Sequence, residues 1–224
     1  TAVIIGLGGI GRSWLREIRR HPDWECIGIV DTDTELLENL KSDYPAIVEE
    51  VTPDNLPLSI LQKVLQRLLG EGIPIRDLAL IIEALLEYIK VTKNIDVLTE
   101  YVRHSLSETI KKLYQDDKGV IHAIALDGMI EDIMTNALQS NNQNALVPSL
   151  GLPPDTIRNI NDSISQAIEE ATMQGYMPIV ICSAQVRPYF YRMIHSQFPM
   201  VSVISYTELP ADTDIELISR IYLS

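Results

Sequence analysis

Lysine is missing from the last 106 residues of this 224-residue chain, because none follows Lys118. In that stretch four arginines face eleven acidic residues, which leaves a net charge of about −7 within the chain's total of −13. Nucleic-acid binding depends on clustered lysine and arginine, so this balance argues against a nucleic-acid partner. We interpret the acidic surface as mainly solvating, with steering of a basic partner as the alternative.

Cysteine is also scarce, and long apolar runs are absent. Cys26 and Cys182 lie in apolar, strand-like segments without metal-ligand spacing, which predicts buried thiols and suits a reducing compartment. No apolar stretch reaches the roughly 18 residues that a membrane-spanning helix needs, and no signal sequence is present. The chain begins at Thr1 without methionine, so we treat it as part of a longer protein and leave open membrane segments elsewhere in that parent.

Catalytic and metal-binding spacings are missing as well. The histidines at positions 21, 104, 122 and 195 are scattered and show no ligand pattern such as H-E-x-x-H, so we interpret them as structural or exposed. Ser183 lacks the G-x-S-x-G elbow of a hydrolase nucleophile. We therefore predict a protein that is not an enzyme and that uses no metal.

What the sequence does contain begins with a glycine-rich turn after a short apolar strand. Gly6 permits a tight turn, Gly8 lets the backbone approach a pyrophosphate, and Gly11 lets the following helix pack closely on the strand. A second predicted strand, residues 26–30, leads into Asp31, where a carboxylate would bind a ribose 2′-hydroxyl. Strand, turn, helix, strand and acid therefore predict a Rossmann-like βαβ segment.

The segment resembles the N-terminus of the glucose-fructose oxidoreductase and inositol dehydrogenase family, particularly in residues 6–12 and 29–33. In that family this opening binds NAD or NADP. The resemblance covers only residues 1–40, and the family's third strand, Glu-Lys-Pro element and substrate domain are missing. Half a nucleotide site cannot hold a dinucleotide tightly, so we predict a scaffold without bound cofactor. An NAD-dependent oxidoreductase fragment is the alternative.

Apolar residues then recur at the 3.6-residue spacing of helices, which predicts a helical bundle subdomain over residues 41–118. Gly70 and Gly72 are placed to end the first helix, Pro74 to start the second, and Asn94 or Asp96 to cap the third. The predicted helices run over residues 58–69, 75–90 and 96–114, with a further helix near residues 36–40. Their predicted buried stripe is Ile60, Leu61, Val64, Leu65, Leu68, Leu69, Leu78, Ile81, Ile82, Leu85, Ile89, Leu98, Val102, Leu106, Ile110 and Leu113.

Strand-like and helix-like segments alternate over residues 119–224, which predicts a two-layer α/β subdomain. Ser183 is a candidate cap of its third helix, and a loop from Gln139 to about Pro153 is long enough to suggest mobility or a binding edge. The whole chain is thus predicted as mixed α/β. The predicted strands are residues 120–126, 178–182, 200–206 and 215–223, and the predicted helices start near residues 128, 154 and 186.

Several stretches carry a second and more specific resemblance. They are residues 44–51, 61–69, 71–78, 98–103, 187–190 and 203–209, with Gly-Ile-Pro-Ile-Arg-Asp-Leu at residues 72–78 as the most specific part. They look like the cytoplasmic domain of the large export-gate protein of bacterial type III secretion systems, a family with flagellar and virulence members. This resemblance runs from about residue 36 to the C-terminus, over 80% of the chain. Residues 205–209 lean toward the virulence members.

The resemblance implies a non-enzymatic protein-transport component at the cytoplasmic face of the bacterial inner membrane, in a membrane-anchored parent. Identical subunits would form a nine-membered ring that docks chaperones and export substrates. Arg76, Asp77, Glu100 and Arg103 would then be subunit contacts, although Arg76 and Asp77 also fit a helix-dipole or surface-charge role. One family subdomain, which forms much of the docking cleft, is absent. A chimera joined near residues 33–44 is a further alternative.

Overall fold

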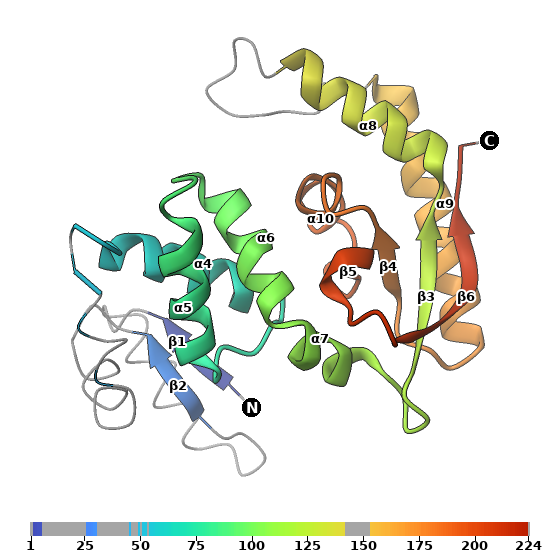
Figure 1. Ribbon diagram of the computed structural model, residues 1–224. Coiled ribbons are helices and arrows are strands. Elements are labelled where there is room, and N and C mark those ends of the chain that lie inside the picture. The colour runs from blue at the N-terminus through green and yellow to red at the C-terminus, as the bar shows by residue number, and fades with distance from the viewer. Residues whose placement is uncertain are drawn as a thin grey trace. The chain divides into compact units, whose positions relative to one another are not determined.

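The computed structural model describes residues 2–5, 26–30, 45, 49, 51–52, 54–141 and 153–223. The chain forms two compact units, Thr1–Leu106 and Ser107–Ser224. Figure 1 shows helices in the first unit and a sheet with helices in the second, which confirms the predicted mixed α/β class. No described helix is both long and apolar enough to cross a membrane.

Two short parallel strands lie at the start of the chain. The strands β1 (Ala2–Ile5) and β2 (Cys26–Val30) pair with each other, and Ile4 lies beside Ile29. The sequence predicted both strands. The helix expected between them, the glycines of the turn, Asp31 and the helix expected near residues 36–40 all lie outside the described residues.

From residue 54 to residue 106 the described helices of the helical subdomain are α4 (Leu58–Gly70), α5 (Leu78–Tyr88) and α6 (Ile95–Ser105). The first ends as predicted at glycine, because Gly72 adopts a positive φ of 75°. Ile73 N–H then bonds the Leu68 carbonyl and Gly72 N–H bonds that of Leu69, the pattern of a Schellman cap. The Asn94 side chain accepts a bond from Asp96 N–H, so Asn94 is the cap of α6.

Two helix boundaries differ from the prediction. Helix α5 starts at Leu78 instead of residue 75, because Ile73 and Ile75 are buried in a non-helical connection and are not part of a helical stripe. The predicted helix over residues 96–114 is broken at Leu106 into α6 and α7 (Ser107–Tyr114). Ser105 Oγ donates back to the Tyr101 carbonyl at 3.2 Å, a bond that competes with the helix ladder and favours a bend there.

The second unit is built on a four-stranded, all-parallel sheet. Its strands are β3 (Val120–Leu126), β4 (Ile179–Cys182), β5 (Ser202–Ser205) and β6 (Asp214–Ile221), in the order β5-β4-β3-β6. The register between β3 and β6 shifts once, because Ala123 lies beside Leu217 and Ile124 beside Ser219. Ile218 is therefore an extra residue, a β-bulge in β6.

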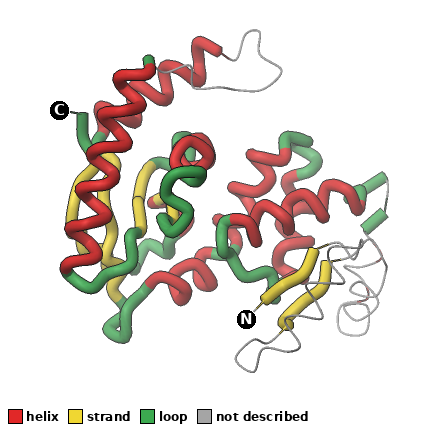
Figure 2. The backbone as a smooth tube through the Cα atoms, turned by 180° about the vertical axis from the view of Figure 1, so that it is seen from behind, coloured by secondary structure: helices red, strands yellow, loops and turns green. Residues whose placement is uncertain are grey.

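Helices α8 (Gly128–Asn141), α9 (Pro154–Met173) and α10 (Arg187–Ile194) share one apolar core with the sheet. Figure 2 shows α9 running along the strands. The strand residues in this core include Ile124, Leu126, Val180, Cys182 and Val203, which alternate along their strands and so lie on one face. The predicted layer of helices on a sheet is confirmed.

Three details of this unit were predicted differently. Helix α8 continues to Asn141, past the point where a loop was expected to begin at Gln139, and the rest of that loop lies outside the described residues. Strand β5 is shorter than predicted. Ser183 does not cap α10 with its side chain; instead its carbonyl accepts bonds from the N–H groups of Val186 and Arg187, which makes a turn before the helix.

Candidate interaction surfaces

The four residues predicted as subunit contacts occupy different environments. Arg76 and Asp77 are exposed in the non-helical connection before α5, and the Asp77 carbonyl accepts the first helical bond, from Ile81 N–H at 3.1 Å. Glu100 is half-buried on α6, and Arg103, on the same helix, is only 1% exposed. The sequence had suggested that Arg76 and Asp77 lie in the first turn of the helix. In the structure both residues precede the helix.

Arg103 ties two helices together. Its Nη1 donates to Glu71 Oε2 at 2.7 Å, and Glu71 is the residue that follows α4. The two charges are therefore paired within the subdomain, and little of Arg103 is exposed for contact with another chain. The sequence placed Arg103 at a polar edge because it could not show that this position of α6 turns inward.

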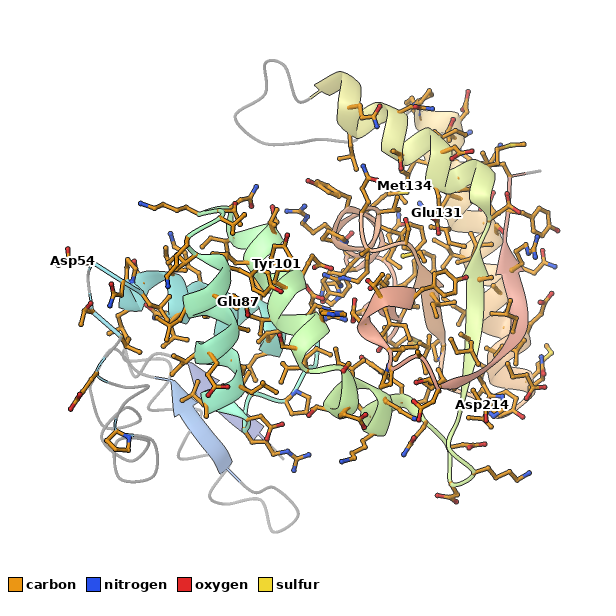
Figure 3. The ribbon with its side chains drawn as sticks, in the orientation of Figure 1. Asp54, Glu87, Tyr101, Glu131, Met134 and Asp214 are labelled. Carbon is orange, nitrogen blue, oxygen red and sulfur yellow. The ribbon has the colours of Figure 1, made fainter. Side chains whose placement is uncertain are left out.

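A second ion pair and an aromatic stack also connect helices of this subdomain. Arg67 on α4 contacts Asp96 in the first turn of α6. The rings of Tyr88 and Tyr101 stack at 3.8 Å between centroids, nearly parallel at 4°, and link α5 to α6. Figure 3 labels Tyr101 together with Glu87 of α5. The 3.6-residue pattern gave no signal for these contacts, because it locates apolar faces and not polar partners.

The C-terminal unit also buries an arginine. Arg187, fully buried at the start of α10, has its Nε 3.3 Å from Glu208 Oε1, and its Nη1 donates to the Val203 carbonyl at 3.4 Å. Glu208 closes the short helix η1 (Tyr206–Glu208) and accepts bonds from both the N–H and the hydroxyl of Ser205. This network holds the end of β5 against α10. It involves two stretches whose family resemblance was noted, but their pairing was not predicted.

His122 lies between two carboxylates at the amino end of the sheet. Its Nε2 is 3.1 Å from Asp116 Oδ2, its Nδ1 is 3.2 Å from Glu216 Oε2, and its ring stacks on Tyr176. Hydrogen bonds lower the pKa of Asp116, first from Val120 N–H and then from His122. Each side chain of this cluster contacts another member of it, so we interpret the cluster as structural.

Polar residues also gather at the carboxyl ends of the strands. Glu131 accepts a bond from Ser183 N–H, and Arg220 lies 3.5 Å from Asp127. Burial, followed by the charge of Glu131, raises the pKa of Tyr206. This edge is where parallel α/β sheets usually bind ligands. Within the described residues no three His, Cys, Asp or Glu side chains are placed to hold a metal ion.

The comparisons with known proteins identify the family. The chain belongs to the FHIPEP family, whose family model matches residues 14–214. It is similar to the flagellar biosynthesis protein FlhA of Bacillus subtilis, with 34% identity over 90% of this chain and 29% of that protein. It is also similar to the low calcium response locus protein D of Yersinia pestis, with 29% identity over 93% of this chain and 29% of that protein.

Solved structures agree with this assignment. The chain resembles Chlamydia pneumoniae CdsV, determined in a complex with CdsO, at a TM-score of 0.75 and 32% identity over 84% of this chain and 53% of that one. It also resembles the nonameric EPEC SctV-C, at a TM-score of 0.69 and 26% identity over 83% of this chain and 55% of that one. The chain thus spans less than a third of the curated relatives and about half of the solved domains.

The comparisons correct the predicted seam. The family match begins at residue 14, inside the segment that we had assigned to a dinucleotide-binding start, and not at about residue 36 as predicted. They give no support to the oxidoreductase resemblance or to NAD binding at Gly6, Gly8, Gly11 and Asp31. A glycine-rich turn after a short strand is a weak signal because any strand that runs directly into a helix favours glycine there.

Proposed function

We propose that the chain is the cytosolic part of a type III protein export gate, flagellar or virulence-related, and that it assembles into a ring of identical subunits. The observation that carries this proposal is the family match over residues 14–214, together with the fold shared with a nonameric relative. In the cell it would lie at the cytoplasmic face of the bacterial inner membrane, anchored through other parts of its parent protein. It would act by binding, without catalysing a reaction.

The proposed ring would use the exposed polar residues of the helical subdomain. Arg76 and Asp77 are adjacent, opposite in charge and exposed in the connection before α5, so a neighbouring subunit could engage both. Glu100 on α6 is half-buried, so part of the residue remains exposed on the helix. Arg103 enters the proposal as a positioning residue, since its bond to Glu71 fixes α6 against the end of α4.

The proposed partners are export substrates and their chaperones. The complex of CdsV with CdsO supports a docking role for proteins of this fold. The net charge of −13 favours partners with basic surfaces. Similarity to both a flagellar and a low-calcium-response protein leaves both systems open as the setting.

Mass photometry of the purified chain at increasing concentration tests ring assembly. The expected result is a species of nine chain masses that grows at the expense of the monomer. Charge reversal at the proposed contact, Arg76→Glu combined with Asp77→Lys, should shift the equilibrium toward the monomer because it places like charges together. Lys118→Glu, an exposed change in the other unit, is the matched control and should assemble as the parent does.

A chain that stays monomeric at every concentration would overturn ring assembly for this sequence. The export role itself is tested separately, by replacing the corresponding segment of Bacillus subtilis FlhA with residues 54–223 of this chain. Restored swimming motility supports the role. Loss of motility with a stably expressed, ring-forming hybrid contradicts it.

A further inference from the structure

Strand β6 has an open edge. It is last in the order of the sheet and pairs only with β3 within the described part of the chain, and Figures 1 and 2 both draw it at the outer border of its sheet. Its eight residues make it the longest strand described. Main-chain N–H and C=O groups on the side away from β3 are therefore available to a further strand, which is how many domains bind extended peptides.

Some of the usual protections of an edge strand are missing from β6. Lysine and proline, which often block edge pairing, are absent from residues 214–221. The bulge at Ile218 interrupts the ladder and leaves residues 214–217 as a regular stretch in register with β3. The opposite edge strand, β5, has four residues and runs directly into η1, so it offers a much shorter edge.

Residues 214–217 alternate between acidic and apolar side chains. Glu216 lies beside His122, which is two residues before Ile124 in β3, so Asp214 and Glu216 point to the face of the sheet that packs on the helices. Leu217 lies beside Ala123 and points to the other face, as does Ile215. The Glu216 side chain is 64% exposed and Leu217 is 51% exposed, so both are available to a neighbouring strand.

A second copy of this edge is a poor partner for it. Two identical strands that pair antiparallel around Ile215 place Asp214 opposite Glu216 on the same face, and pairing around Glu216 places that residue opposite its own copy. Like charges directly opposite each other destabilise a sheet. The favoured partner is instead a strand with basic side chains on the acidic face and apolar side chains on the other.

We propose that β6 docks an extended peptide segment with alternating basic and apolar residues, which adds to the sheet as a fifth strand beside residues 214–217. Main-chain bonds would give the affinity, Asp214 and Glu216 would select lysine or arginine, and Ile215 with Leu217 would contact the apolar residues. The inference goes beyond the proposed ring and export role, and it does not depend on either.

Fluorescence anisotropy with labelled nine-residue peptides tests the proposal. An alternating lysine–valine peptide should bind, whereas an alternating glutamate–valine peptide should not. A peptide of the same composition with its lysines grouped at one end should bind at least about tenfold more weakly. Equal binding of the alternating and grouped peptides would reduce the interaction to charge alone and overturn the proposal.

Backbone pairing has its own readout. Because alternate residues of an added strand point their N–H groups toward β6, methylation of one alternate set of peptide nitrogens should abolish binding, and methylation of the other set should not. Two methylated peptides that both bind as the parent does would rule out strand addition. Hydrogen exchange followed by mass spectrometry should also show protection in the segment containing residues 214–217.

Two substitutions locate the site on the chain. Asp214→Lys and Leu217→Lys should each weaken binding of the lysine–valine peptide about tenfold, because each places a positive charge beside the incoming lysines or apolar residues. Met200→Lys adds the same charge in the exposed turn just before the other edge strand, β5, and should leave binding unchanged. Circular dichroism checks that each variant is folded. Equal weakening by all three variants would contradict a site at β6.

Discussion

Among the described residues, each of the two units buries one arginine, and the two arginines are held in different ways. Arg103 in the helical subdomain meets Glu71, whose side chain is 12% exposed. Arg187 in the C-terminal unit meets Glu208, whose side chain is 2% exposed, and the same carboxylate also accepts bonds from Ser205. The first pair lies at a helix end close to solvent, and the second lies inside a closed network.

The difference shows what each unit requires from its polar residues. The helical subdomain is held mainly by apolar stripes, and its ion pairs fasten the ends of helices that would pack without them. In the C-terminal unit the chain turns from β5 into η1 beside buried backbone groups, which need bonding partners. We therefore expect the loss of a carboxylate to be more damaging there than in the helical subdomain.

The largest expected effect comes from Glu208. Replacing it by glutamine leaves Arg187 buried without a counter-charge and weakens the bonds to Ser205, so we expect the free energy of unfolding to fall by about 3–5 kcal/mol. Urea denaturation measures this loss. Hydrogen exchange should locate it in peptides of the C-terminal unit, and a change confined to the helical subdomain would contradict the comparison.

The same substitution at Glu71 should lower the free energy of unfolding by a smaller amount. Glu71→Gln retains a neutral acceptor for Arg103, and water can reach that end of α4, so a loss of about 1–3 kcal/mol is expected. Glu87→Gln on the exposed side of α5 is the matched control and should change stability by less than about 0.5 kcal/mol. If Glu71→Gln proved as damaging as Glu208→Gln, the two arginines would be equivalent after all.

A smaller effect tests the local signals of the helical subdomain. Asn94→Ala removes the side-chain acceptor that caps Asp96 N–H, and we expect the free energy of unfolding to fall by about 1 kcal/mol. Asn94→Asp should retain the cap and serve as the rescue variant. Thermal unfolding followed by circular dichroism compares the three proteins. Equal melting of the alanine and aspartate variants would show that this bond does not stabilise the helix.

The smallest effect concerns pH. The pKa of Asp116 is lowered in the folded chain by the Val120 N–H and by His122, so its carboxylate favours folding above the unfolded-state pKa, and this contribution is lost as the pH falls through the folded-state value. Asp116→Asn should therefore be less stable than the parent near neutral pH, and the difference should shrink in strong acid. Urea midpoints measured from pH 7 down to pH 2 test this sign.

Much of the fold could be predicted because it depends on local patterns. Leu61, Leu65 and Leu68 recur at helical spacing and are buried as expected, and Gly72 ended its helix for the reason that the sequence suggested. Leu113 belonged to the predicted stripe but is 37% exposed, since the break at Leu106 ends the continuous helical spacing on which that stripe was based. The ends of helices depend on side-chain hydrogen bonds, which the spacing of apolar residues does not predict.

The interaction surfaces were less predictable because they depend on residues far apart in the sequence. Arg103 and Glu71 are 32 positions apart, and Ser219 and Glu170, which bond at 2.6 Å, are 49 apart. Composition and spacing identify such residues only as polar. The subunit-contact role of Arg76, Asp77 and Glu100 stays a prediction. The glycine pattern is the opposite case, since it is local and yet the comparisons give no support to the family that it resembles.

Ile218 changes which of its neighbours lie inside the protein. If Ile218 were an ordinary member of the strand, strict alternation along Asp214–Ile221 would put Leu217 and Ile221 on the same side, yet Ile221 is fully buried and Leu217 is half exposed. Deleting Ile218 would leave every remaining residue opposite its present companion in β3. The deletion would therefore preserve the strand pairing and join the two short runs of β6 into one regular strand, and its cost would be the packing of the Ile218 side chain against the core.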